Sequence, residues 1–299
     1  MTLKSAAMTA PATTSSAFRQ VRGLEVLTWP AFDGFDVDVM VTTRHGGVSS
    51  GPYAALNLSL NVGDSVDGVL ENRRRVAAAL GADLGDFVLG EQVHAGVARV
   101  VGAADRGRGT RSPADAVPGA DALVTADPGT VLAVLAADCV PVVLYDPVRH
   151  VIACAHAGWR GTVARVAASA VTAMGSLGTR AADVVAGVGP AIAPARYEVG
   201  PEVAQSAERY FGDRAGDVLS PAPVGPGRWL FDLWTANRIV LREAGVPDSQ
   251  IHVTDVPTGP DGGGRFFSHR AERPSGRFAT VARLRPAGRT PPQDPRGTR

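Results

Sequence analysis

Three short apolar runs lie close together in the middle of the chain and predict a buried sheet. Each has the length and the continuous apolar character of a strand that is covered on both faces. The runs span residues 131–136 (VLAVLA), 140–145 (VPVVLY) and 151–155 (VIACA). Asp138 and Cys139 interrupt the sequence between the first two runs, and His156 follows the third. The pattern therefore places a cysteine and a histidine at strand ends.

The rest of the chain alternates between strand and helix patterns. Short apolar or alternating segments predict strands at residues 35–43, 87–89, 97–101, 184–188, 251–256 and 279–284. Helical spacing predicts helices at residues 66–80, from 162 to about 174, at 201–210 and at 233–244. Because the elements interleave without a regular βαβ repeat, we predict an α/β (α+β) fold, with one mixed sheet layered with helices. A single domain is expected at residues 21–285, between a disordered leader (1–20) and a disordered tail (286–299).

Two polar segments have ordinary interpretations. Arg73, Arg74 and Arg75 follow one another in the predicted helix 66–80, and such a run is typical of a solvated helix face. Residues 104–119 form a polar loop rich in Gly, Arg, Pro and Asp, which has the length of a lid or of a mobile segment.

Composition narrows the partners. The 299 residues include 30 basic and 29 acidic side chains, mixed along the sequence, and only 6% aromatics, which argues against nucleic-acid binding. Asp138 and Pro141 break the longest apolar run well short of the roughly 20 residues that a membrane-spanning helix needs. The first residues contain no continuous apolar stretch of the kind found in a signal peptide. We therefore expect no membrane partner. With only two cysteines, we also expect no disulfide framework and a cytoplasmic location.

Cysteine and histidine together suit a borderline-soft metal ion, zinc first. The sequence contains no local C-x-x-C or H-E-x-x-H pair, so spacing alone does not identify a site. From the residues, Cys139 and His156 form either a metal or thiol site, or a buried small cysteine and a satisfied histidine. Cys154 shares a strand face with His156, and we interpret it as a core residue.

Several motifs together resemble the YfiH/YlmD family, also described as the laccase-domain or peptidoglycan-editing-factor family of purine nucleoside phosphorylases. The motifs are TTRHGGVS (42–49), QVHAGV (92–97), ADALVT (120–125) with ADC (137–139), HAGWRGT (156–162), GPAIAPARYEVG (189–200), FDLWTAN (231–237) and FFSHR (266–270) with Gly276–Arg277. The likeness extends over about residues 25–285. In one place the chain differs, because it has Pro257 where many relatives carry a cysteine.

The resemblance implies a zinc ion held by His94, Cys139 and His156. It also implies phosphorolysis of adenosine, inosine and methylthioadenosine, and deamination of adenosine, so that the partners are a purine nucleoside and phosphate. Copper would occupy the same three ligands only adventitiously. We expect a monomer.

Other motif residues receive roles as hypotheses. Arg44 and Arg160 are candidate catalytic phosphate clamps, because guanidinium binds phosphate through two parallel bonds. Asp138, next to the ligand cysteine, is a candidate catalytic residue that orients a ligand or moves a proton. The expected substrate-binding residues are Arg44, His45, Gln92 and Arg270.

Three other functions compete. A copper polyphenol oxidase needs a blue-copper site and a histidine-rich oxygen-reducing cluster, and six histidines are too few for both. A cysteine-type amide hydrolase would use Cys139 as nucleophile and His156 or His94 as base, on an amide or a peptidoglycan precursor. The third alternative is a non-catalytic peptidoglycan-editing or cell-wall factor with a structural metal site.

Overall fold

The computed structural model describes residues 15–223 and 225–285, and most strands of this part of the chain belong to two six-stranded sheets. The first sheet has the order β1 (Ala17–Val21), β2 (Leu24–Thr28), β3 (Val37–Thr42), β15 (Phe278–Leu284), β7 (Val131–Ala136), β4 (Phe87–Leu89). The second has the order β14 (Ile251–Val253), β10 (Val185–Val188), β8 (Val140–Asp146), β9 (Val151–Ala157), β6 (Ala122–Thr125), β5 (Ala98–Val100). The single sheet that we expected is therefore divided in two.

Both sheets are mixed, as predicted. In the first sheet the strands pair antiparallel except for β4, which runs parallel to β7. In the second sheet, β5 is parallel to β6 and β14 is parallel to β10. The parallel pairs place the carboxyl ends of β4 and β7 at the same edge of the first sheet.

The two sheets pack face to face. Their inner faces share one hydrophobic core, to which the first sheet contributes Leu132 and Val134 of β7, and the second contributes Val143 of β8. Cys154 of β9 is fully buried in this core, which confirms its interpretation as a core residue. The alternating inward residues of each strand thus close the middle of the molecule.

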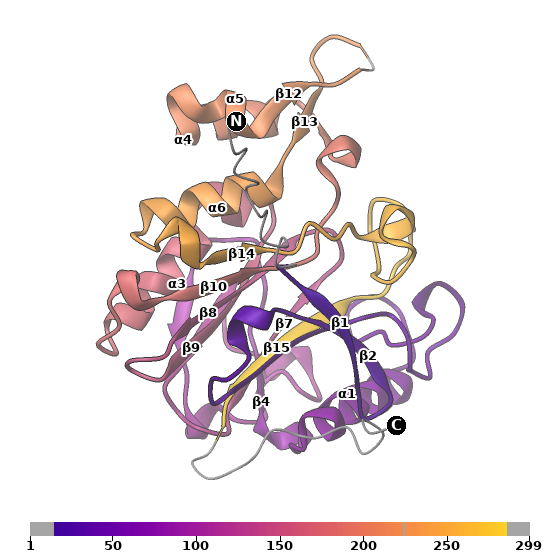
Figure 1. Ribbon diagram of the computed structural model, residues 1–299. Helices are drawn as coiled ribbons and strands as arrows, with labels where there is room; N and C mark the ends of the chain where they lie inside the picture. The colour runs from indigo at the N-terminus through magenta and orange to yellow at the C-terminus, as the bar shows by residue number, and fades with distance from the viewer. Residues whose placement is uncertain (1–14, 224, 286–299) are drawn as a thin grey trace, which may run out of the picture.

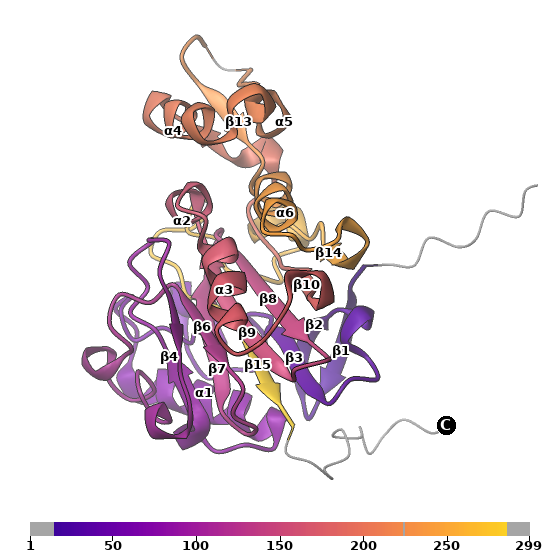
Figure 2. The same ribbon diagram turned by 90° about the vertical axis from the view of Figure 1, so that its left-hand side faces the viewer.

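Helices cover the outer faces. α1 (Val66–Leu80) packs on the outer face of the first sheet, while α3 (Val166–Gly175) and α6 (Leu233–Glu243) pack on that of the second. Figure 2 shows α3 lying along the strands of the second sheet. The result is a four-layer arrangement of helix, sheet, sheet and helix, which confirms the predicted layered α/β class.

A smaller unit sits at the end of the molecule opposite α1 (Figure 1). It contains a three-stranded sheet and two helices. These elements are β11 (Glu198–Val199), α4 (Pro201–Phe211), α5 (Ala215–Val218), β12 (Leu219–Pro221) and β13 (Trp229–Phe231). Its apolar residues join the same core as α3 and α6.

The chain after His156 forms two helices where the sequence predicts one. α2 (Trp159–Val163) ends before Arg165, whose φ of 62° lies in the left-handed region, and α3 starts directly after it. A non-glycine residue in this conformation cannot continue a right-handed helix. None of the described helices is both long enough and apolar enough to cross a membrane.

The N-terminal strands differ from the predicted leader. Residues 17–20, assigned to that leader, form most of β1, which pairs antiparallel with β2. The pairing escaped prediction because the middle of β1 is exposed and lacks apolar alternation. Arg22 and Gly23, both with positive φ, make the tight turn of this hairpin. Residues 1–14 and the predicted tail at 286–299 lie outside the described residues.

Candidate active site

Two histidines and a cysteine meet at one end of the sheet sandwich. The ligand atoms of His94, Cys139 and His156 all lie within 4.8 Å of one another. The rings of His94 and His156 meet edge to face, with centroids 4.8 Å apart. His156 is buried at the end of β9, whereas His94 is exposed. The three residues predicted as ligands are thus brought together.

Two connections between the sheets carry Cys139 and His94. Residues 137–139 connect β7 of the first sheet to β8 of the second, and Cys139 is the last residue before β8. Residues 90–97 connect β4 of the first sheet to β5 of the second, and they carry His94. Because β4 and β7 are parallel, both crossings leave the first sheet at the same end. His94 and Asp138 have φ values of 61° and 91°, so the backbone turns sharply at both places.

Asp121 fixes the arrangement from behind. Its carboxylate accepts hydrogen bonds from the backbone N–H groups of His94 and Ala95, at 3.0 and 2.7 Å. The same carboxylate lies 3.0 Å from Nδ1 of His156, and Asp121 is fully buried. With Nδ1 engaged in this way, Nε2 of His156 is left for a ligand. One carboxylate therefore orients two of the three candidate ligands.

Gly158 leaves room for the sulfur. A Cβ built on this residue would lie 2.7 Å from Sγ of Cys139 and 3.2 Å from the ring of His94. Its φ of −72° is open to any residue, so the need for glycine here is steric. The glycine of the HAGWRG motif therefore makes space for the side chains of the site.

The cysteine and the buried histidine form a charged pair. Burial alone would raise the pKa of the Cys139 thiol, but the positive charge of His156 and hydrogen bonds from both histidines lower it to about 6. Burial works in the opposite direction on His156, and there the Cys139 thiolate and the Asp121 carboxylate raise the pKa. A thiolate and two imidazoles are the ligands that zinc and similar ions take up, with release of protons. The donor set therefore fits a metal ion with three protein ligands and an open fourth position.

The three residues are among those that line a cavity of about 450 Å³, within the range of small-molecule sites. Two arginines and another histidine also line it: Arg73, Arg277 and His269. Its acidic lining residue is Glu91, whose carboxylate accepts a hydrogen bond from the Gly119 N–H. The cavity is therefore positively charged beside the candidate ligands.

Two sequence-predicted residues near this cavity have structural partners. The Asp138 carboxylate accepts a hydrogen bond from Thr258 Oγ1 and another from the Arg270 backbone N–H, each at 2.6 Å. Gln92 lines the cavity, but its amide bonds through both oxygen and nitrogen to the backbone of Leu135, each at 2.8 Å. Asp138 thus holds the 258–270 segment in place. The Gln92 amide pairs with the backbone of β7 as a neighbouring strand would. Their assigned catalytic and binding roles stay predictions.

The two predicted phosphate clamps point elsewhere. Arg44 pairs with Glu272 at 3.1 Å and covers the ring of Phe267, and it is not among the lining residues of the cavity. Arg160 is more than half exposed, stacks on Trp159 and pairs with Glu202 at 3.2 Å. Both guanidinium groups have a carboxylate partner and neither lines the cavity. Their assigned roles as phosphate clamps stay predictions.

His45 and Arg270 also lie outside the cavity lining. His45 is exposed, and its backbone N–H is bonded to Thr43 Oγ1. The Arg270 side chain donates to the Glu198 carbonyl at 3.0 Å and covers the ring of Tyr197. Neither side chain lines the cavity, and their assigned roles in substrate binding stay predictions.

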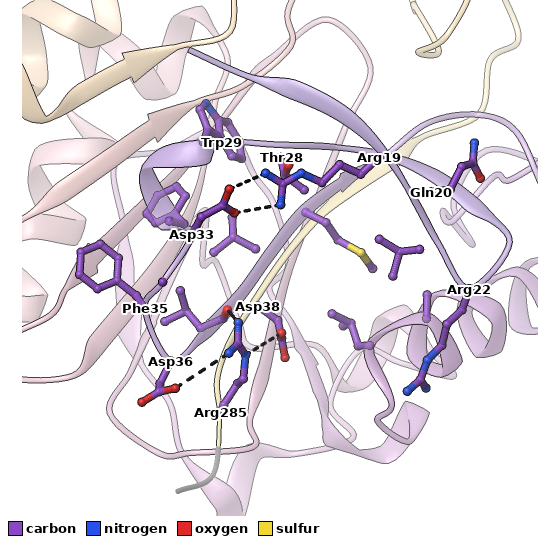
Figure 3. Close-up of a pocket in the computed structure, with 18 residues that line it drawn as sticks. Arg19, Gln20, Arg22, Thr28, Trp29, Asp33, Phe35, Asp36, Asp38 and Arg285 are labelled. Atoms are coloured by element: carbon purple, nitrogen blue, oxygen red, sulfur yellow. Dashed lines mark hydrogen bonds and ion pairs between the residues drawn. The ribbon is translucent and has the colours of Figure 1, made fainter. Parts of the chain in front are cut away.

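A second, larger cavity of about 630 Å³ lies between the β1–β2 hairpin, β3 and the end of α1 (Figure 3). Figure 3 shows ion pairs at its rim, Arg19 with Asp33 and Arg285 with Asp36 and Asp38. It contains none of the three candidate ligands. The smaller cavity, which the three candidate ligands line, is therefore the candidate active site.

The sequence analysis missed three residues of this site. Asp121 stands in the ADALVT motif, yet nothing in its spacing points to His156, 35 positions later. Arg73 was interpreted as part of a solvated helix face, but it is only 7% exposed. Arg277 directly precedes β15. The Gly276–Arg277 pair belongs to the motif resemblance, but the sequence analysis assigned it no role. Arg74 and Arg75 do face solvent, where both pair with Glu71.

Comparisons with known proteins identify a matching family model and several relatives. A family model described as multi-copper polyphenol oxidoreductase laccase matches residues 38–285. The chain is 40% identical over 237 residues to a purine nucleoside phosphorylase, YlmD, of Geobacillus stearothermophilus, covering 78% of this chain and 84% of the relative. It is 38% identical over 216 residues to adenosine deaminase RL5 of an unknown prokaryotic organism, covering 72% and 81%. The crystal structure of a Bacillus licheniformis protein, YfiH, superposes with a TM-score of 0.84 at 34% identity, covering 90% of this chain and 99% of that one.

Proposed function

The chain belongs to the family described as multi-copper polyphenol oxidoreductase laccase, which includes the YfiH/YlmD proteins, and we propose that it is a zinc-dependent purine nucleoside phosphorylase that also deaminates adenosine. The observation that carries this proposal is the three-ligand group beside a positively charged cavity. A relative named as a phosphorylase and another named as an adenosine deaminase support the two reactions. The proposed substrates are adenosine, inosine and methylthioadenosine.

His94, Cys139 and His156 would hold the zinc ion. Two imidazoles and one thiolate are ligands that zinc prefers, and three protein ligands are typical of a catalytic zinc site. When bound, zinc supplies a Lewis acid that polarises a substrate oxygen or activates water. Both cysteines are free, which supports the reducing cytoplasm as the location. The expected monomer remains a prediction for size-exclusion measurements.

In phosphorolysis, an oxygen of orthophosphate forms a bond to C1′ of the ribose while the bond from C1′ to the purine nitrogen breaks. The bonding electron pair leaves with the purine, which takes up a proton, and the products are the free base and ribose 1-phosphate. The chain must hold the phosphate dianion close to the sugar. A positively charged cavity suits that task, because its cations offset the charge of the anion.

A copper polyphenol oxidase stays disfavoured despite the family description. All six histidines lie in the described residues, and the only group there of three or more potential metal ligands is His94, Cys139 and His156. A blue-copper site and an oxygen-reducing cluster need more histidines than this.

One observation favours a second candidate, a cysteine-type amide hydrolase. The Cys139 thiol contacts His156, and His156 contacts Asp121. The three side chains therefore have the arrangement of a nucleophile, a base and a carboxylate that orients the base. The pKa of the Cys139 thiol, lowered to about 6, is suitable for a nucleophile. A peptidoglycan-derived amide would be the substrate in that case.

Metal content and product analysis separate the two candidates. We expect about one zinc per chain, and adenine from adenosine only when phosphate is present, with inosine formed in its absence. Removing the metal with a chelator should abolish both activities, and Cys139→Ala and His156→Ala should do the same. A metal-free protein with an intact amidase activity would instead establish the hydrolase.

A further inference from the structure

We propose that Arg277, supported by Arg73, forms a subsite that binds orthophosphate in the cavity that the three candidate ligands also line. This inference rests on the proposed function, because it names where the second substrate of phosphorolysis binds. It replaces the earlier expectation that Arg44 and Arg160 hold the phosphate.

The Arg277 guanidinium is available for an anion. Its Nη1 donates to the carbonyl oxygens of Ser275 and Gly276, at 2.7 and 2.9 Å, and among the described residues it has no carboxylate partner. The side chain is partly buried and lines the cavity together with Cys139. Nη1 is the only guanidinium nitrogen of Arg277 with a hydrogen bond to the described residues, so the remaining N–H groups are free to bind an oxyanion.

Arg73 adds a second guanidinium group to the cavity lining. It is 7% exposed, and its guanidinium donates to the carbonyl oxygens of Leu58, Gly109 and Thr110 at 2.7–2.9 Å. Within the described residues it too lacks a carboxylate partner. Burying a charge without a counter-ion costs stability, so such a residue is expected where an anionic ligand supplies the missing charge.

One backbone segment holds both arginines in register. Arg73 Nε donates to the Leu58 carbonyl at 2.9 Å, and the Leu58 N–H donates to the Arg277 carbonyl at 3.0 Å. The Arg277 N–H donates to Asn57 Oδ1 at 2.9 Å. The Arg73 side chain and the Arg277 backbone are therefore both held by residues 57–58 before any ligand binds. A preorganised site loses little free energy in ordering.

His269 lies on the same cavity and completes the polar lining. Its pKa is lowered, first by burial and then by the neighbouring charge of Arg277. A neutral imidazole can donate one hydrogen bond to a phosphate oxygen without adding charge. The cavity volume of about 450 Å³ leaves room for a nucleoside as well as phosphate.

The test compares Arg277→Gln with the wild-type holoenzyme. We expect the KM for phosphate in adenosine phosphorolysis to rise about tenfold or more, the loss of one charge-assisted contact. The KM for adenosine should change less than the KM for phosphate, and Arg277→Lys should be intermediate because it keeps the charge without the fork. Arg22→Gln is the matched control, since Arg22 donates to the Ala78 carbonyl and lines the other cavity (Figure 3).

A binding measurement keeps this proposal separate from the proposed function. Sodium phosphate, compared with chloride at equal ionic strength, should raise the melting temperature of the wild type and of Arg22→Gln, but not of Arg277→Gln. If the wild type cleaves no nucleoside, the proposed function fails and the melting shifts alone judge the subsite. Equal stabilisation of Arg277→Gln by phosphate, or an unchanged KM for phosphate, overturns the subsite. The subsite is also overturned if Arg277→Gln weakens inhibition by AMP but leaves the KM for phosphate unchanged. The arginine would then bind the 5′-phosphate of a nucleotide.

Discussion

The Asp121 carboxylate lies 3.0 Å from Nδ1 of His156. Asp121 directly precedes β6, and His156 lies in the neighbouring strand β9. His156 also donates its backbone N–H to the Asp121 carbonyl at 2.8 Å. The pair is therefore fixed by both main chain and side chain. Because Asp121 also binds the backbone of the loop that carries His94, a change at this residue reaches two candidate ligands at once.

Asp121→Asn should weaken metal binding by about 10–100-fold, the usual effect of removing the partner of a ligating histidine. The amide cannot accept every hydrogen bond that the carboxylate accepts, so the ring of His156 and the loop at His94 lose their common support. Competition with a chromophoric chelator measures the affinity. Asp127→Asn, which alters a partly exposed pair with Arg106, is the control and should bind metal normally. Equal affinities of the two variants would contradict the role of Asp121.

Gly158→Ala should lower metal affinity by about tenfold or more, the range seen when supporting groups of a metal site are disturbed. The added Cβ would lie 2.7 Å from Sγ of Cys139, so the sulfur has to move. The midpoint of urea unfolding should change little, because the backbone conformation suits alanine. Gly175→Ala, at a glycine with open space around it, is the control for affinity. Normal metal binding by Gly158→Ala would show that the site tolerates the extra methyl group.

In the metal-free protein, Cys139 should react with iodoacetamide along a titration centred near pH 6. The thiolate is the reactive form, and its fraction grows as the pH rises through the pKa of about 6. The rate should therefore increase between about pH 5 and 7 and then level off, where an ordinary thiol with a pKa of about 8.5 continues to gain. Mass spectrometry after timed labelling measures this.

Cys154 is the internal control for this labelling. It is fully buried in the core, and burial raises its pKa, so it should stay unmodified in the folded protein. Added zinc should protect Cys139, because a metal-bound thiolate is no longer free to react. A rate at Cys139 that still rises steeply at pH 9 would refute the charged pair with His156.

Asp38→Ala should destabilise the fold by about 3–5 kcal/mol, the cost of leaving a buried charge unpaired. Asp38 and Arg283 are 8% and 6% exposed and are bonded at 2.5 Å, and Arg285 donates to the same carboxylate. Urea unfolding measures the loss. Asp248→Ala breaks an exposed pair with Arg238 and should cost at most about 1 kcal/mol. Similar losses for the two variants would argue against a special role of the buried pair.

Local patterns of apolar and polar residues were sufficient to predict most individual strands and helices. The strands β7, β8 and β9 were predicted from continuous apolar runs, and helix α1 was predicted with its observed bounds. The β1–β2 hairpin was missed, because its outer strand has no apolar face to reveal it. Arg73 was misjudged for a related reason. Helix periodicity shows which residues share a face, but it does not show that a loop from residues 109–110 covers that face.

The amino-acid sequence by itself determined the mixed α/β class, the buried strands and, through motif resemblance, the three candidate metal ligands. Only the tertiary structure decided which side chains meet at the site. His94 and Cys139 come together because two crossings between the sheets leave from the same end, and Asp121 joins them across a strand pairing. Arg277 reaches the same cavity because β15, the last strand, lies between β3 and β7 in the first sheet. These are contacts between residues far apart in sequence, and hydrophobic periodicity, which acts over a few residues, carries no information about them.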